Sequence, residues 1–219
     1  MKGCRPLTPD EYTRCIAACG DDSMTRCLLM TGVRTGYRIA ELLSLRIADV
    51  YDLDTDAVRE YVTVAAKDMK GSREGRRVRV HGEAREVIAA HVAHLRSLRR
   101  IEAGWSLFPS RKTPPTSTAI SLCSRTSASL SRIPHSDSGP PPLSIRAAQA
   151  RLTSLFRAAG VPHTGSHTLR KTFVARCMQA ANGDLRRVQR ATGHARIETL
   201  CAYYDPSDEL VDDMVLSAT

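Results

Sequence analysis

The chain has 219 residues, 42% of them hydrophobic, and its 32 lysines and arginines against 23 aspartates and glutamates give a net charge of +9 at pH 7. This length and composition are typical of a globular protein with a sizeable core, and we expect one domain. The positive charge favours a polyanionic partner such as nucleic acid. Because no apolar run resembles a signal peptide or a membrane span, we expect a soluble, intracellular protein.

The seven cysteines are an odd number without a CxxC pair, and most lie within apolar helical patterns. We therefore interpret them as buried, reduced thiols of a cytosolic protein. Cys15 and Cys19 lie four residues apart, and His91 and His94 three residues apart, and both spacings could suit a metal ion. Because neither pair has a complementary partner, we expect no metal, and we interpret both histidines as helix-surface residues.

The first strong signal along the chain is a helix start. Thr8 suits the N-cap position, Pro9 the first helical position, and Glu11 would close a capping box. Two helices with a break near Gly20 would then form a scaffold as far as Gly32.

A turn followed by an apolar stripe then places one arginine at the edge of the core. Gly36 allows a tight turn, and the apolar residues of 39–45 form the buried side of a helix. Arg38 stands at the junction, and Glu41 lies on the same helix face, where it could brace the guanidinium. The alternative is a surface ion pair worth only about 0.3–0.5 kcal/mol. We favour the brace because further candidate site residues follow.

The next segment predicts a basic β-hairpin. Residues 59–66 and 76–81 alternate and are rich in β-formers, and residues 47–50 could form a short strand before them. Six basic residues lie from Lys67 to Arg79, around a polar, glycine-containing tip. Such a hairpin can enter a DNA groove and bring a lysine to a reacting group. A solvated hairpin is the alternative.

The middle of the chain holds a long amphipathic helix, over 83–103, and then changes composition. Serine, threonine and proline dominate residues 111–142, which we expect to form a flexible insertion. It could be a surface excursion or a basic arm that follows the DNA backbone, and we favour the surface excursion. Helical patterning resumes over 143–159.

The last third of the chain collects groups suited to handling a phosphate. A helix that starts near residue 166 would place His167 and Arg170 on one face near its N-terminus, where backbone N–H groups and the helix dipole favour an anion. Arginine adds a planar, always-charged fork. A turn containing His194 and a short helix carrying Tyr203 and Tyr204 follow. Each residue alone is better explained as part of a solvated basic surface, so the ordered set carries the inference.

These motifs together resemble one family. TGYRIAELLSL resembles the first arginine motif of the tyrosine recombinases, the phage-integrase family, and the basic hairpin resembles their lysine-bearing turn. SHTLRKTF resembles their His-x-x-Arg motif, and TGHARIETLCAYY their Gly-His segment that ends in the nucleophilic tyrosine. The resemblance covers residues 8–204 apart from the insertion. It implies an α+β, mainly α-helical fold with a small three-stranded antiparallel sheet.

The resemblance also implies a function and a set of site residues. The function is that of a site-specific DNA recombinase of the integrase, excisionase or invertase type, which cleaves and rejoins strands through a covalent 3′-phosphotyrosyl link without cofactor, metal or ATP. Its implied catalytic residues are Tyr203, Arg38, Arg170, His167, His194 and Lys70, with Glu41 in support. The arginines and His194 would stabilise the phosphate, the lysine would protonate the leaving oxygen, and His167 would assist proton transfer or hold the phosphate.

Two of these assignments choose between neighbours. Tyr203 follows His194 by nine residues, as the family pattern requires, whereas Tyr204 would point about 100° away on a helix. Lys70 lies closer to the hairpin tip than Lys67 and fits the family's placement better. Residues expected to contact DNA are Lys67, Arg73, Arg76, Arg77, Lys171, Arg187 and Arg190.

The expected organisation is a single catalytic domain over residues 1–219 without an N-terminal core-binding domain, and with a C-terminal tail helix at about 207–217. Expected partners are double-stranded DNA and further copies of the chain, in a tetrameric synapse, with accessory DNA-bending proteins as candidates. The expected location is the cytoplasm, for a protein encoded by a bacterium, phage or mobile element. Two alternatives stay open, a type IB topoisomerase that relaxes DNA without paired sites and a catalytically idle DNA-binding regulator.

Overall fold

The computed structural model describes residues 4–69, 74–110, 139–201, 203 and 216. Its helices are α1 (Pro9–Ala18), α2 (Ser23–Thr35), α3 (Ile39–Leu43), α4 (Ile47–Val50), the 3-10 helix η1 (Ala66–Asp68), α5 (Gly82–Leu98), α6 (Ile145–Ala158), α7 (Ser166–Ala180), α8 (Leu185–Thr192) and α9 (Glu198–Cys201). Its strands are β1 (Tyr51–Asp52), β2 (Ala57–Val58), β3 (Tyr61–Val64) and β4 (Arg76–Arg79). The described part is mainly helical, as expected, and none of its helices combines the length and apolarity needed to cross a membrane.

The predicted helix start at Thr8 is confirmed. The Thr8 hydroxyl accepts from the backbone N–H of Glu11 at 3.2 Å, and the Glu11 carboxylate accepts from the backbone N–H of Thr8 at 3.0 Å. Pro9 is the first residue of α1. This reciprocal capping box satisfies backbone donors that a helix start otherwise leaves free.

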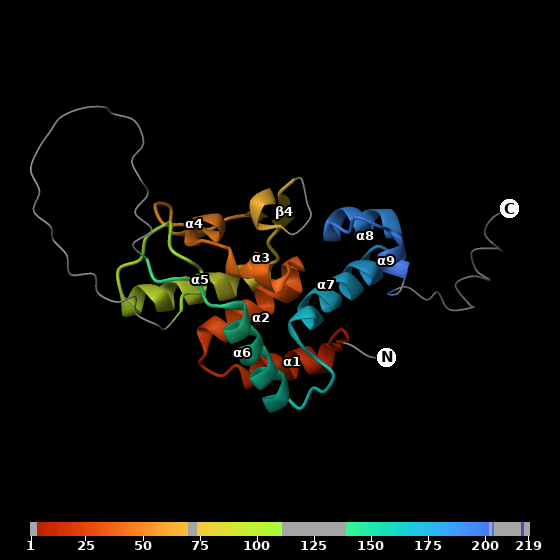
Figure 1. Cartoon of the computed structure of the whole chain (residues 1–219), viewed down its shortest axis with the longest axis horizontal. Coiled ribbons are helices and arrows are strands. Elements are labelled where there is room, and N and C mark those ends of the chain that lie inside the picture. The colour runs from red at the N-terminus through yellow and green to blue at the C-terminus, as the bar shows by residue number, and fades with distance from the viewer. Residues whose placement is uncertain (1–3, 70–73, 111–138, 202, 204–215, 217–219) are drawn as a thin grey trace, which may run out of the picture.

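Helix α2 is the centre of the core. Its residues Leu28, Leu29 and Val33 are fully buried, and α5, α6 and α7 all pack against it, as Figure 1 shows. A Cβ on Gly32 would lie 2.6 Å from the Leu169 Cδ1 atom, so this glycine permits α2 and α7 to approach closely. The C-terminal end of α2 is thereby held against the first turns of α7.

A second, smaller apolar cluster joins the last three helices, which lie together at one end of the molecule in Figure 1. Its buried members are Val174, Met178, Val188 and Leu200. Because these residues come from α7, α8 and α9, they set the position of the turn between α8 and α9 and of the residues that follow α9.

The strands differ from the expectation in one respect. In the described residues they form two separate two-stranded antiparallel sheets, β1 with β2 and β3 with β4, in place of one three-stranded sheet. Residues 47–50, which could have been a strand, form helix α4. The Asp49 carboxylate accepts from the backbone N–H of Arg46 at 2.7 Å, and the N–H groups of Ile47 and Ala48 donate to carbonyls of residues 105 and 103. These bonds supply acceptors for the backbone N–H groups at the start of this single helical turn.

The ends of the expected insertion are paired with each other. The backbone N–H of Ser110 donates to the Pro141 carbonyl at 2.7 Å, and that of Leu143 donates to the Phe108 carbonyl at 2.8 Å. Residues 111–138 of the insertion lie outside the described residues, as does the tail helix expected at about 207–217 except for residue 216. The segments before and after the insertion are therefore hydrogen-bonded to each other.

The interpretation of His91 as a surface residue is wrong, because the side chain is 1% exposed. Its Nε2 lies 2.9 Å from the Leu107 carbonyl oxygen, and its Nδ1 lies 3.1 Å from the Ser23 hydroxyl. The carbonyl can only accept, so the neutral ring carries its proton on Nε2 and accepts from Ser23. Burial lowers the pKa of His91 to about 4.

The buried His91 predicts acid sensitivity of the fold. The unfolded chain takes up this proton near pH 6.5, whereas the folded chain keeps the ring neutral until about pH 4, so stability falls as the pH decreases through that window. Between pH 7.5 and pH 5 we expect this residue alone to lower the free energy of unfolding by about 2 kcal/mol. Urea unfolding at both pH values measures the loss, and His91→Gln should reduce it. An identical pH dependence in both proteins would contradict the assignment.

Candidate DNA-cleavage site

Arg170 lies at the centre of the candidate site. It is the fifth residue of α7, and its side chain is 7% exposed. Its Nη1 donates to the Gly36 carbonyl at 2.8 Å, and its Nη2 donates to the Thr192 carbonyl at 3.0 Å. Burial, together with repulsion from Arg38 and Arg76, lowers the pKa of Arg170 to about 10, so the guanidinium stays charged at neutral pH. It connects the end of α2 to the end of α8.

Arg38 enters the same site from the turn before α3. Its Nη1 and its backbone N–H each donate to the Glu41 carboxylate at 2.8 Å. The Glu41 side chain is 2% exposed and the Arg38 side chain 39%. A buried carboxylate thus holds the backbone and the side chain of a guanidinium that still reaches solvent. This geometry matches the expected brace and differs from a surface ion pair, in which both groups would be solvated.

His194 follows the left-handed Gly193, which ends α8 with a φ of 66°. Its Nε2 lies 3.3 Å from Arg170 Nη2, and its Nδ1 lies 2.6 Å from the Thr192 hydroxyl oxygen. A guanidinium can only donate, so Nε2 accepts, and the proton of the neutral ring is on Nδ1. The Thr192 hydroxyl is free to accept it because that hydroxyl donates to the Val188 carbonyl at 2.8 Å.

The same surroundings keep the His194 ring neutral. Burial is the main cause, and the positive charges of Arg170, Arg38 and Arg76 add to it, so the pKa of His194 falls to about 4. In the free protein the Nε2 atom of this neutral ring is an acceptor at physiological pH. It becomes a donor at Nε2 only when that nitrogen gains a proton.

Tyr203 lies just beyond α9, with its backbone N–H donating to the Leu200 carbonyl at 2.9 Å. Its ring is partly buried against the smaller apolar cluster, and Lys171 Nζ lies 5.9 Å from the ring centroid. Burial raises the pKa of the Tyr203 hydroxyl, while the charge of Arg170 opposes that rise. Tyr203 therefore lies within the electrostatic reach of Arg170. Tyr204 lies outside the described residues.

His167 and Arg170 share α7 but differ in environment. Arg170 is buried, whereas His167 is exposed in the first turn of the helix. Within the described part of the chain, no hydrogen bond joins the His167 side chain to another residue. Its ring is therefore open to solvent at the end of α7 where backbone N–H groups favour an anion.

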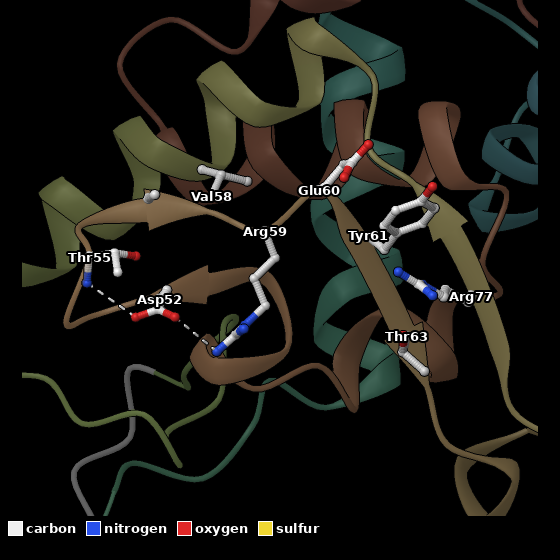
Figure 2. Close-up of a pocket in the computed structure, with 9 residues that line it drawn as sticks. Asp52, Thr55, Val58, Arg59, Glu60, Tyr61, Thr63 and Arg77 are labelled. Carbon is white, nitrogen blue, oxygen red and sulfur yellow. Dashed lines mark hydrogen bonds and ion pairs between the residues drawn. The ribbon is translucent and has the colours of Figure 1, made fainter.

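The residues expected to contact DNA are either at the surface, outside the described residues or buried. Arg77, Lys67, Arg187 and Arg190 are exposed, and Lys171 is partly exposed. Figure 2 shows Arg77 beside the Tyr61 ring, and the guanidinium carbon lies 3.7 Å from the ring centroid. Lys70 and Arg73 lie outside the described residues, so their predicted roles stay predictions.

The predicted contact of Arg76 with DNA is corrected, because the structure places this side chain in the interior. Its side chain is only 8% exposed, and its guanidinium lies 4.8 Å from the centroid of the Tyr37 ring. It cannot contact DNA from that position. The alternation of β4 carried a signal for this burial, since Arg76 shares its face of the strand with Val78 and Val80.

The structure also adds residues that the motifs did not indicate. Thr192 fixes the His194 tautomer, and the Gly36 carbonyl anchors Arg170. Neither role has a signal in the sequence, because a threonine at a helix end and a backbone carbonyl resemble many others. The described residues contain no group of three His, Cys, Asp or Glu side chains that could hold a metal ion.

The fold is that of the tyrosine recombinases. A crystal structure of XerA recombinase matches with a TM-score of 0.65 and 22% identity, covering 99% of this chain and 64% of that one. XerH site-specific recombinase bound to difH substrate has a TM-score of 0.65 and 19% identity, covering 100% of this chain and 56% of that one. The Tn1549 transposon integrase in complex with a circular intermediate DNA has a TM-score of 0.65 and 15% identity, covering 100% and 67%.

Residues 5–209 match the model of the phage integrase family, and the chain belongs to that family. The resemblance seen in the sequence motifs is thereby confirmed. The chain spans less than two thirds of the length of the XerA and XerH structures. A search of curated proteins finds no match.

Proposed function

We propose that this chain is the catalytic part of a site-specific DNA recombinase that cleaves and rejoins strands through a covalent 3′-phosphotyrosyl intermediate. One observation carries the proposal. The buried guanidinium of Arg170 contacts His194 and lies within the electrostatic reach of Arg38 and Tyr203. These groups come from four separate segments of the chain, and their interaction with Arg170 supports a shared site. Family membership over residues 5–209 supports the same reaction.

In the proposed reaction the Tyr203 hydroxyl oxygen attacks the scissile phosphorus, and the bond from phosphorus to the 5′-oxygen breaks. The phosphotyrosyl bond keeps the phosphodiester energy, so rejoining by the released 5′-hydroxyl needs neither ATP nor a metal ion. Arg38 and Arg170 stabilise the charge that develops on the non-bridging oxygens. Glu41 holds Arg38 in place, and Arg170 is already fixed by backbone carbonyls.

The Nε2 atom of His194 can donate to a phosphate only after it gains a proton. Its Nε2 accepts from Arg170 in the free protein, so donation to a phosphate oxygen requires a proton on that nitrogen. The negative phosphate favours that proton by raising the pKa of the ring. We assign His167, exposed at the start of α7, to proton transfer at the tyrosine or to holding the phosphate.

The assembly and partners follow from the same chemistry. Recombination at two sites requires four cleavages, so we propose a homotetrameric synapse on double-stranded DNA, with accessory DNA-bending proteins as candidate partners. Arg77, Lys67, Lys171, Arg187 and Arg190 are exposed or partly exposed basic groups that we assign to the DNA backbone. The protein would act in the cytoplasm, where DNA of bacterial, phage or mobile-element origin lies.

Covalent capture on random DNA tests the proposal. The protein is incubated with a randomised duplex library, adducts that resist detergent are isolated, and the attached DNA is sequenced. We expect adducts enriched in one sequence for the wild type and none for Tyr203→Phe. No adduct with wild type would overturn the proposal, as would DNA binding unchanged by Tyr203→Phe with no covalent product. Adducts without sequence enrichment, together with plasmid relaxation, would instead indicate a topoisomerase.

The lysine assignment gives a separate prediction. Lys70→Ala should slow adduct formation by about 10²-fold because the departing 5′-oxygen loses its proton donor. A substrate with sulfur in place of that oxygen should restore the rate, since a thiolate leaves without protonation. Lys67→Ala is the comparison variant. Because Lys67 is assigned to the DNA backbone, at saturating DNA it should affect the oxygen and sulfur substrates equally. The reverse pattern would transfer the role to Lys67.

A further inference from the structure

We propose that Arg76 is a positioning residue of this site, which ties β4 to the C-terminal turn of α2 and to the Gly193 turn and so holds Arg170 and His194 in place. The inference rests on the proposed function. In place of the expected contact with DNA, Arg76 would position the groups that bind the phosphate.

Arg76 is a buried charge without a carboxylate partner. In the described part of the chain no acidic side chain forms an ion pair with it, and its Nε is buried without a hydrogen-bond partner. Its guanidinium lies between two rings, 4.8 Å from the centroid of Tyr37 and 5.6 Å from that of Phe173. Burying an unpaired charge is costly, and two aromatic faces offset only part of that cost. The burial of this charge therefore also depends on the backbone carbonyls that its Nη atoms reach.

The donors of Arg76 meet the same backbone turn that anchors Arg170. Its Nη2 donates to the Thr35 carbonyl, and its Nη1 lies 3.5 Å from the Gly36 carbonyl oxygen, which accepts from Arg170 at 2.8 Å. These carbonyls end α2, where the helix dipole favours a cation. Gly36 has a φ of 64°, and a Cβ there would lie 2.2 Å from the Phe173 ring. Both guanidinium groups thus fasten one glycine turn, and Arg38 follows two residues later.

Arg76 also reaches the turn that carries His194. A Cβ on Gly193 would lie 3.1 Å from Arg76 Cδ, so the side chain passes directly beneath this turn. The Arg76 backbone is fixed as well, because the Tyr37 hydroxyl lies 2.6 Å from the Arg76 carbonyl oxygen. One residue therefore connects β4, the turn before α3 and the turn after α8.

The charge of Arg76 acts on the site in addition to its contacts. It helps to lower the pKa of Arg170 and that of His194. Among the described residues Glu41 is the only buried carboxylate. It pairs with Arg38, and its negative charge also acts on Arg76 and Arg170. The excess of positive charge is suited to a phosphate that arrives with the DNA.

Two variants separate geometry from charge. Arg76→Gln removes both, whereas Arg76→Lys keeps the charge but cannot bond to two carbonyls with a planar fork. The readouts are the rate of adduct formation at saturating DNA, the Kd for DNA, and the pKa of His194 by NMR. Arg151→Gln is the matched control, because it removes a partly buried guanidinium whose bonds go to Asp22 and Thr25.

We expect both Arg76 variants to cleave at least about tenfold more slowly at saturating DNA, with Kd within about threefold of wild type. The His194 pKa should rise in Arg76→Gln and stay low in Arg76→Lys. A cleavage rate in Arg76→Gln equal to that of Arg151→Gln would overturn the proposal. If Arg76→Gln fails to fold, Arg76→Lys decides, and a wild-type rate in that variant overturns it. If wild type forms no adduct, the proposed function fails, and an unchanged His194 pKa in Arg76→Gln separately overturns the role of Arg76.

Discussion

Replacement of Arg170 by alanine is expected to slow covalent adduct formation by about 10²–10³-fold, because it removes a preorganised donor from the phosphate in the transition state. The variant also removes the hydrogen bonds that Arg170 donates to the carbonyls of Gly36 and Thr192 and to the Nε2 of His194. His194 should therefore lose its fixed orientation. Single-turnover cleavage of a nicked duplex that carries the captured sequence measures the loss.

Two comparisons sharpen this result. Arg170→Lys keeps the charge but cannot reach two carbonyls and the imidazole at once, so we expect it to recover less than about a tenth of the lost rate. Arg176 lies on the same helix as Arg170, but its guanidinium lies 4.4 Å from the centroid of the Tyr12 ring on α1. Arg176→Gln removes that guanidinium and is the control. It should cleave at close to the wild-type rate. A rate within tenfold of wild type for Arg170→Ala would contradict the central role of this residue.

Replacement of Glu41 by alanine is expected to affect both stability and cleavage. The carboxylate is 2% exposed and accepts two donors from Arg38. Without it, Arg38 loses both of these hydrogen bonds and is repelled by Arg170. We expect a loss of about 2 kcal/mol in the free energy of unfolding, from removal of a buried, charge-assisted pair. We also expect a loss of about tenfold or more in cleavage rate, since Arg38 is no longer held toward the phosphate.

Glu60→Ala is the matched control for Glu41→Ala. It breaks an ion pair of the same length, 2.8 Å to Arg79, but both of its side chains are largely exposed. Its effect on the free energy of unfolding should be within about 0.5 kcal/mol. Urea unfolding and single-turnover cleavage are measured for both variants. Equal effects of the two substitutions would show that Glu41 is an ordinary surface partner.

Local signals in the sequence predicted much of the site. The Thr8 capping box, the glycine turn before Arg38 and the three-residue spacing to Glu41 depend on neighbours along the chain. Such features are set by short-range geometry, and the structure has each of them. The order of the motifs then identified the family, because the ordered set is specific although each motif alone is weak.

Burial was less predictable, since it depends on segments that are distant in the sequence. His91 can be buried because Ser23, earlier in the sequence, and the Leu107 carbonyl, later in the sequence, supply its hydrogen-bond partners. Arg76 is buried because Tyr37 and Phe173 bring rings from two other elements. A helical or alternating pattern shows which face a residue shares, but not what covers that face.

The most direct test of the proposed nucleophile is to identify the residue that bears the DNA. An adduct formed with the captured sequence is digested with nuclease and protease, and mass spectrometry locates the remaining nucleotide. We expect a phosphotyrosyl bond at Tyr203, with Tyr204 unmodified. A nucleotide on Tyr204 or on any other residue would contradict it.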